Sequence, residues 1–223
     1  MKDTQNNTDY LSILDEKIGN LSETAIVRED VAPYLASKRQ GEYTLEDYLA
    51  IPDEYRTELI DGVIYDMASP RDIHQIVNGT IYVELYNHIK KKKGKCIVLH
   101  APMDVQLDCD DRTVVQPDIL IVCDRKKFKN GRVFGAPDFV VEVLSPSTRK
   151  KDIQIKTRKY RNAGVREYWM VDIEKEQIIV YRFEKSDLAA IYTFQDKIPV
   201  GIFDDECEVD FAEVAEKIAF LKE

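Results

Sequence analysis

A single acidic residue inside an apolar strand constrains this chain more than any other feature of its sequence. The segment FVVEVL, residues 139–144, has the composition of a strand that is covered on both faces, and Glu142 lies in the middle of it. Burying a carboxylate without a compensating partner is strongly unfavourable. The fold must therefore bring a cation, either a side chain or a metal ion, to the face of the strand that carries Glu142.

Nearly solid apolar runs alternate with helical patterns along the chain. Strands are predicted for 139–144 and for TVVQPDILIVC (113–123), EYWMVD (167–172), QIIVYRF (177–183) and AAIYTF (189–194), and Asp61-Gly62 predicts a hairpin turn within TELIDGVIYDM (57–67). Helical spacing predicts helices over about 72–90, about 149–163 and from residue 211 onward. Strands covered on both faces indicate an α/β fold with a mixed central β-sheet flanked by helices.

The length of 223 residues is that of one domain with an appended arm. In the first part, residues 1–40, Leu11, Leu14, Ile18 and Leu21 recur at helical spacing. This pattern predicts an N-terminal helical arm that packs on the body or on a second subunit, with a partly disordered tail as the alternative. Residues 41–223 are expected to form the body of the protein.

Composition and charge limit where the chain works and what it binds. No apolar run approaches the ~20 residues of a membrane helix, and the polar N-terminus lacks the apolar core of a secretory signal, so we expect a cytoplasmic protein. The four cysteines lie far apart without a CxxC pair, which favours reduced thiols. The net charge of −9 argues against coating nucleic acid by bulk electrostatics, so any such contact needs a local basic patch.

The carboxylate best placed to share a cation with Glu142 is Asp118. Asp138 lies on the same strand as Glu142, but four residues along a strand span roughly 13 Å, whereas carboxylates that share an ion bring their oxygens within ~2.0–2.6 Å of it. Asp118 begins a separate apolar run, and adjacent strands are only about 4.8 Å apart. On one face of a sheet the two acids would form an oxygen site for a hard cation such as Mg²⁺.

The helix predicted after this strand offers a lysine on its inner face. At 100° per residue, Tyr160 lies about 20° and Lys156 about 60° from Ile153, on the arc that makes the apolar contacts. An ammonium group there could lie over the carboxylates and stabilise negative charge on a scissile phosphate. The alternative is a lysine whose stem covers apolar surface while its charge reaches water.

Several motifs resemble the Uma-type "putative restriction endonuclease" family, a branch of the PD-(D/E)xK phosphodiesterase superfamily. They are ELIDG (58–62), Ser69-Pro70 with His74-Gln75, QPDI (116–119), EVLSPST (142–148), the spacing of Asp152, Lys156 and Tyr160, and AGVREYWMVD (163–172). The match covers roughly residues 43–185, and EVLSPST followed by AGVREYW is quite specific. The resemblance implies a restriction-endonuclease-like core and a nuclease-like catalytic domain within residues 41–223.

The resemblance also implies the catalytic set. The superfamily pattern places a lysine two residues after the acid, where this chain has Leu144; the family it resembles takes the lysine from the next helix, which fits Lys156. Glu58 matches the acid before LIDG that commonly supports the metal, with a surface glutamate as the alternative. The implied metal, Mg²⁺ or Mn²⁺, would be held by Asp118, Glu142, the Val143 carbonyl and Glu58.

Four further residues are candidates for substrate contacts. Gln116 could contact substrate or water, or be an ordinary exposed strand residue. His74, near the start of the predicted long helix, could donate to a phosphate or orient a water, or simply pack. Arg149 and Lys150 belong to a basic cluster with Lys151, Arg158 and Lys159 that could follow a nucleic-acid backbone.

The expected function is that of a metal-dependent phosphodiesterase, an endonuclease that hydrolyses DNA through a Mg²⁺-activated water. One alternative is a nuclease-fold protein without turnover that acts as a DNA-binding or assembly module; another is a metal-dependent hydrolase of RNA or small phosphoesters. A homodimer is favoured because nucleases of this type often cut both strands as dimers. No motif specifies a recognition sequence.

Overall fold

The computed structural model describes residues 34, 38–146 and 149–221. These residues belong to two compact units, one made of the chain up to residue 68 with 110–114, the other of residues 69–109 with 115 onward. The predicted N-terminal helix around Leu11–Leu21 lies outside the described residues, and the predicted division at residue 40 stays a prediction. Among the residues described, no helix has both the length and the apolar character needed to cross a membrane.

The first unit contains a capped helix and a hairpin. Helix α2 (Leu45–Ala50) ends before Pro52, and the Asp47 carboxylate accepts hydrogen bonds from the Thr44 amide and hydroxyl at its start. Strands β1 (Thr57–Ile60) and β2 (Val63–Asp66) pair antiparallel around the predicted Asp61-Gly62 turn. Both turn residues have positive φ, 51° and 78°, which is the type I′ geometry that Asp-Gly favours.

The second unit is built on a six-stranded mixed sheet. Its order is β12-β11-β10-β9-β6-β3, and only β9 and β10 run parallel. The strands are β3 (Ile97–His100), β6 (Ile119–Val122), β9 (Phe139–Leu144), β10 (Glu167–Asp172), β11 (Gln177–Arg182) and β12 (Ala190–Thr193). β6, β9 and β10 are buried along their whole length, as their apolar sequences predict.

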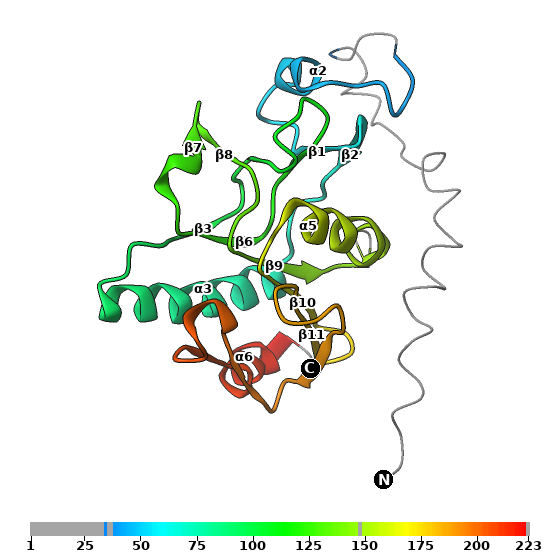
Figure 1. Cartoon of the computed structure of the whole chain (residues 1–223). Coiled ribbons are helices and arrows are strands. Elements are labelled where there is room, and N and C mark those ends of the chain that lie inside the picture. Colours follow the sequence, from blue (N-terminus) through cyan, green and yellow to red (C-terminus); the bar gives the residue numbers. More distant parts are fainter. Residues whose placement is uncertain (1–33, 35–37, 147–148, 222–223) are drawn as a thin grey trace. The chain divides into compact units, whose positions relative to one another are not determined.

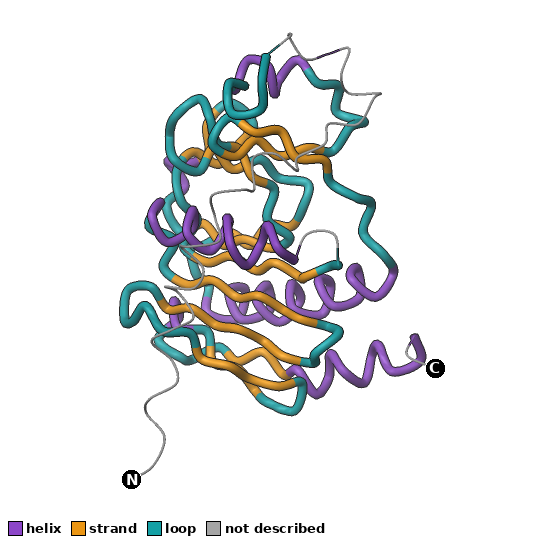
Figure 2. The backbone as a smooth tube through the Cα atoms, turned by 90° about the vertical axis from the view of Figure 1, so that its right-hand side faces the viewer, coloured by secondary structure: helices purple, strands orange, loops and turns teal. Residues whose placement is uncertain are grey.

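Helices cover both faces of this sheet, which Figures 1 and 2 show from two directions. One face packs against α3 (Asp72–Lys92) and α6 (Phe211–Ile218) in a core that includes Val141, Val143 and Trp169. The other face lies under a helical segment that ends with α5 (Thr157–Ala163). Because side chains alternate along a strand, Glu142 points away from the α3 core and toward the second face.

The helical segment under which Glu142 lies contains an irregularity that the sequence did not predict. It starts with α4 (Arg149–Lys151), continues as a π-helical turn at Asp152–Lys156, and ends as α5 before Gly164, which has a φ of 92°. A π turn widens the helix and displaces its side chains from the positions of a regular α-helix. The inward orientation of Lys156 was predicted from a regular helix, but the helix that presents it is locally expanded.

Short elements complete the described chain. β4 (Val105–Gln106), β5 (Val114–Val115), β7 (Phe128–Lys129), β8 (Arg132–Phe134), β13 (Lys197–Pro199) and β14 (Glu208–Asp210) are strands, and η3 (Arg125–Lys127), η5 (Gly201–Phe203) and η6 (Ala219–Leu221) are 3₁₀ turns. In the second unit, β7 pairs with β8, β8 with β4, and β13 with β14. Each of these strands has only two or three residues, too few to show a periodicity in the sequence.

The expectation of reduced cysteines is wrong for one pair. Cys96 and Cys123 form a disulfide. β3 and β6 pair with Ile97 opposite Val122, and continuing that register by one residue brings the two cysteines face to face. Their separation of 27 residues gave no sign of this contact, which depends on strand pairing. Cys109 and Cys207 are free thiols, and burial raises the pKa of Cys207 to about 11.

Substitutions at two positions of α3, one buried and one exposed, can test whether this helix packs against the core. Leu85 is fully buried, whereas Val83 on the same helix is 50 % exposed. We expect Leu85→Ala to lower the free energy of unfolding by about 2–5 kcal/mol, because it removes packed apolar volume from the core. The matched change Val83→Ala should cost less than about 0.5 kcal/mol. Urea titration of both variants measures the difference, and equal costs would contradict the packing described.

Candidate active site

The partner that the buried strand requires is Lys156. Its Nζ lies 2.7 Å from Oε1 of Glu142. Both side chains are almost completely buried, with 2 % and 5 % of their surface exposed. An ion pair at this distance and depth compensates the desolvation of both charges better than either could manage alone. Lys156 therefore does not reach water over an apolar surface, which was the alternative prediction.

Tyr160 binds the same carboxylate. Its hydroxyl donates to Oε1 of Glu142 at 2.6 Å, so Lys156 and Tyr160 share one acceptor oxygen. The ring lies beside that of Tyr168, 5.0 Å between centroids. Burial raises the pKa of Tyr168 well above its ordinary value, and the negative charges of Glu142 and Asp152 raise it further. Tyr168 consequently stays a neutral donor inside a strongly charged region.

Asp152 is a second acid beside Lys156. Its Oδ1 lies 3.5 Å from Nζ of Lys156, one helical turn away along the segment. The π turn that places it there changes the backbone bonding, because the amide of Thr157 bonds to the Asp152 carbonyl five residues back. That carbonyl also accepts from the hydroxyls of Thr157 at 3.2 Å and Tyr168 at 3.4 Å. The irregular turn is thus stabilised by side chains that surround the charge cluster.

Asp118 lies at the start of β6, at the end of the sheet where Glu142 is found. β6 and β9 pair with Ile119 opposite Val141, so continuing the register by one residue sets Asp118 opposite Glu142. Oδ2 of Asp118 accepts a 2.8 Å hydrogen bond from the amide of Val143. The two predicted acids are therefore contributed by neighbouring strands, while Asp138 is occupied elsewhere, accepting from the amide of Cys123.

His74 joins two of the oxygens that were predicted to bind metal. Nε2 lies 3.2 Å from Oδ2 of Asp118 and 3.1 Å from the carbonyl of Val143. Because both partners are acceptors, Nε2 carries the proton. Nδ1 lies 3.1 Å from the side-chain nitrogen of Asn78, one turn further along α3. In this structure His74 contacts Asp118 and the Val143 carbonyl, and its predicted contact to substrate stays a prediction.

The charge state of His74 follows from these contacts. Burial by itself lowers the pKa of the imidazole. The hydrogen bond and the charge of Asp118 oppose this effect, together with the Val143 carbonyl and the charge of Asp152, and their sum raises the pKa above 6.5. The electrostatic environment near the start of β6 and the C-terminal half of β9 thus favours a positive charge between Asp118 and Val143.

The other predicted residues lie in different surroundings. Gln116 is mostly buried and donates to Oδ1 of Asp104 at 3.0 Å. Arg149 forms a bidentate pair with Asp172, and the Lys150 side chain lies outside the described residues. Glu58 is fully buried on β1 in the first unit, so its metal role stays a prediction.

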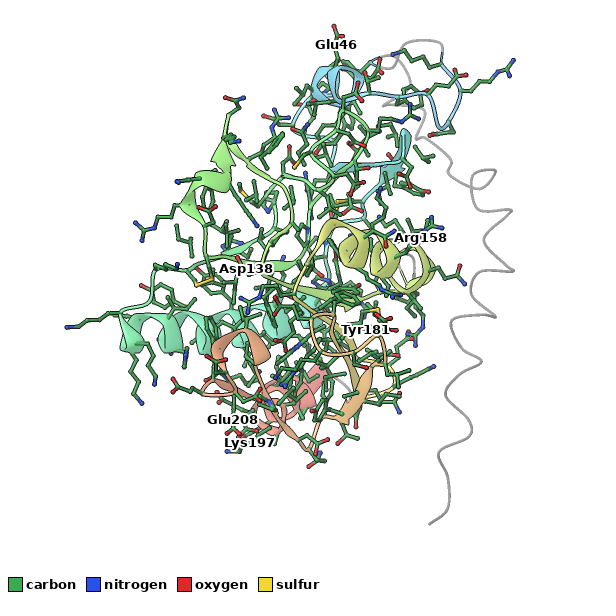
Figure 3. All side chains as sticks on the ribbon, viewed as in Figure 1. Glu46, Asp138, Arg158, Tyr181, Lys197 and Glu208 are labelled. Atoms are coloured by element: carbon green, nitrogen blue, oxygen red, sulfur yellow. A yellow bond between two sulfur atoms is a disulfide. The ribbon has the colours of Figure 1, made fainter. Side chains whose placement is uncertain are left out.

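Much of the predicted basic cluster is neutralised within the protein. Arg149 is held by Asp172, and Lys159 by Asp108. Arg158, labelled on α5 in Figure 3, remains exposed to solvent. Because of these two ion pairs, less positive charge is available to a nucleic-acid backbone near the candidate site than the sequence suggested.

Three residues of this site were missed or undervalued from the sequence. Asp152 was used as part of a family motif without a role, Tyr160 was expected only to pack, and Asn78 was not considered. A signal existed for the first two, since Asp152, Lys156 and Tyr160 recur every four residues on one helical face. Asn78 likewise follows His74 by four residues, but nothing in the sequence distinguished it from a solvated amide.

Comparison with known proteins gives concordant matches. The family model Uma2, described as "Putative restriction endonuclease", matches residues 45–206. An uncharacterized protein of Synechocystis sp. is 29 % identical over 139 residues, which cover 61 % of this chain and 72 % of that protein. The family match spans the strands and helices that carry Glu142, Lys156, Asp118 and His74.

A solved structure shares the fold. The crystal structure of a protein from Anabaena variabilis, titled a putative nuclease belonging to DUF820, superposes with a TM-score of 0.65. The superposition covers 78 % of this chain and 98 % of the other, at 20 % sequence identity. The restriction-endonuclease-like core predicted from the sequence is confirmed by this likeness of folds.

Stability measurements can test the buried pair without any substrate. We expect Lys156→Met to cost about 3–5 kcal/mol of unfolding free energy, because it leaves the carboxylate of Glu142 buried without its cation. The double variant Glu142→Gln with Lys156→Met should recover part of this loss, with a coupling of about 1–3 kcal/mol in a double-mutant cycle. Urea titration of the four proteins supplies the values. Strictly additive costs would show that the two groups do not interact.

Proposed function

The chain belongs to the Uma2 family, and from that membership and the geometry above we propose that it is a divalent-metal-dependent endonuclease acting on DNA. One observation carries the proposal more than the others: Lys156 lies 2.7 Å from Glu142, within a carboxylate cluster that the fold builds at large expense in desolvation. Buried titratable groups that converge from a strand and a helix are typical of catalytic sites.

The donor atoms near Asp118 suit a hard divalent cation. Oδ2 of Asp118 and the carbonyl of Val143 both lie within 3.2 Å of one point, the protonated nitrogen of His74. Two oxygens that already converge on a positively polarised N–H could converge on a metal ion instead. Over the described part of the chain, no three His, Cys, Asp or Glu side chains are grouped to hold a metal, so the backbone carbonyl is an essential member of this set.

Asp118, the Val143 carbonyl and Glu142 would hold the ion, with Glu58 as a further candidate. The chemistry that such an ion supplies is polarisation of the scissile phosphate and acidification of a water ligand. Mg²⁺ and Mn²⁺ both accept oxygen donors of this kind. His74 would position Asp118 and the Val143 carbonyl, consistent with its contacts to both.

The remaining residues supply charge and orientation. Lys156 would donate from its ammonium group to a phosphate oxygen as negative charge develops there, and a donor already fixed before the reaction stabilises that charge efficiently. Tyr160 donates to Oε1 of Glu142, and the Asp152 carboxylate lies 3.5 Å from the Lys156 ammonium group, which it would help to position. Gln116, Arg149 and Lys150 are proposed as contacts to substrate outside the reacting group.

Plasmid nicking in the presence of Mg²⁺ or Mn²⁺ tests this proposal. We expect Glu142→Gln, Asp118→Asn and Lys156→Met each to reduce the cleavage rate by about 100-fold or more, because the two acids would hold the metal ion and Lys156 would stabilise charge on the phosphate. The rate of conversion from supercoiled to open-circular DNA, followed on gels, measures the loss. A parallel assay on single-stranded DNA and RNA defines the substrate class.

Two matched controls are available on the β13–β14 hairpin. Glu208→Gln and Lys197→Met remove the same charges at exposed positions, both labelled in Figure 3. They should leave the rate within about twofold of the wild type, since each exposed charge has little effect on stability. Cleavage that survives Glu142→Gln and Lys156→Met would reject the assignment. No cleavage by any form would favour the DNA-binding or assembly module.

Metal binding can be measured without cleavage. We expect isothermal titration calorimetry to show Mn²⁺ binding to the wild type and loss of at least about tenfold in affinity for Asp118→Asn, because the neutral amide is a much weaker ligand than a carboxylate. Glu208→Gln serves as the control for the lost charge. Equal Mn²⁺ affinity in the wild type and in Asp118→Asn would exclude Asp118 as a ligand.

A further inference from the structure

The β7–β8 hairpin concentrates positive charge on an acidic protein. Five of the eight residues from 125 to 132 are basic, namely Arg125, Lys126, Lys127, Lys129 and Arg132, and no acidic residue occurs between Asp124 and Asp138. The whole chain carries a net charge of −9. A local excess of this kind is not explained by composition, and the motifs used to identify the site do not include it.

These five cations have no acidic partners inside the described protein. Within residues 38–146 and 149–221, none of them forms an ion pair with a carboxylate. Asp124, the nearest acid in the sequence, uses its side chain to accept from the Lys126 amide. Lys127 donates to the carbonyl of Ala136. By contrast, Arg149 and Lys159 near the candidate site are each held by an aspartate.

Two of the charges are held against each other. Lys129 and Arg132 are direct partners in the β7–β8 register, and like charges opposite one another destabilise a strand pair. Asn130 and Gly131 form the two-residue turn between them, with φ of 52° and 78°. Lys129 extends over the ring of Phe134, 4.7 Å from its centroid, which fixes the ammonium group in position. A bound anion would relieve this repulsion.

The hairpin is joined to the segment that leads into the strand of the site, although β7 and β8 belong to a different sheet from β6 and β9. Val133 is fully buried and its amide donates to the carbonyl of Asp104, whose side chain accepts from Gln116, two residues before Asp118. The chain enters the hairpin from the C-terminal end of β6 and leaves it before β9 begins, whereas Asp118 and Glu142 lie toward the opposite ends of these strands. One strand length, roughly 10–13 Å, therefore separates its base from the site.

We propose that the β7–β8 hairpin binds the phosphodiester backbone of duplex DNA beside the scissile phosphate. The separation of roughly 10–13 Å between the base of the hairpin and the site corresponds to about three or four base pairs of duplex, and the cations nearer the turn would contact phosphates beyond that. Fixed cations that contact phosphates orient a duplex without reading its sequence. The identity of the ligand as DNA rests on the proposed function, but the binding itself does not require cleavage.

The salt dependence of DNA binding tests this inference. The full-length protein is titrated onto a fluorescent duplex of about 30 base pairs, in EDTA to prevent cleavage, between about 50 and 200 mM KCl. Each phosphate contact contributes about 0.9 to the slope of log affinity against log salt. We expect the triple variant Lys126→Gln, Lys129→Gln, Arg132→Gln to make this slope about 2–3 less steep than in the wild type.

A second triple variant controls for the change in net charge. Lys91→Gln, Lys93→Gln and Lys95→Gln remove three exposed cations at the end of α3, and should change the slope by less than about one. Arg132→Lys keeps the charge and should keep the wild-type slope. Circular dichroism and thermal melting verify folding; if the hairpin triple variant is unfolded, Lys126→Gln alone should still reduce the slope by about 0.9.

The outcomes separate this inference from the proposed function. Equal slope changes in the two triple variants, or none in either, would overturn it. The inference would also be overturned if the hairpin triple variant lost self-association in light scattering while its slope of log DNA affinity against log salt stayed unchanged. The cations would then bind an acidic surface of a second copy. If the wild type binds DNA through the hairpin but does not cut it, the inference is supported and the proposed nuclease activity is rejected.

Discussion

The contact between Glu142 and Lys156 determines how the second unit is organised. A carboxylate in the middle of a buried strand and an ammonium group on the covering helix are each unfavourable in an apolar interior, and the 2.7 Å pair reconciles them. The register of β9 with its neighbours, the expanded turn of the helix and the hydroxyl of Tyr160 are all arranged around this pair. A hydrophobic pair of similar volume would often fill the same space at lower cost, which agrees with the catalytic role proposed for these two charges.

The sheet and its helices could be predicted because their signals are local. Solid apolar runs marked the buried strands, helical spacing marked α3 and the helix over Glu142, and Asp61-Gly62 marked a turn. The charged pair could also be predicted, since a buried acid needs a cation and Lys156 lay on the inner arc of the next helix. Strand spacing favoured Asp118 over Asp138 as the second acid, and the register of β6 with β9 supports that choice. Family resemblance added Glu58 and gave further support to Lys156.

The remaining features depend on contacts between distant segments, which a single sequence does not reveal. The Cys96–Cys123 disulfide exists because β3 and β6 pair in one register. The π turn at Asp152–Lys156 depends on donors from Thr157 and Tyr168 to one carbonyl. Arg149 and Lys159 looked available for a substrate, yet Asp172 and Asp108 come from segments far from them in the chain. The number of charged residues can be read from the sequence, whereas the ion pairs that they form depend on the fold.

That distinction bears on how an acidic protein could engage a polyanion. At the candidate site, Lys156, Arg149 and Lys159 are paired with carboxylates. The net positive charge offered to a phosphate there would stay low until the proposed metal ion binds. The β7–β8 hairpin differs, because its cations have no described acidic partner. At physiological salt, screening limits the range of the electrostatic interaction of an exposed charge to about 8 Å. An attractive surface one strand away can therefore hold a duplex while the site itself remains closely balanced in charge.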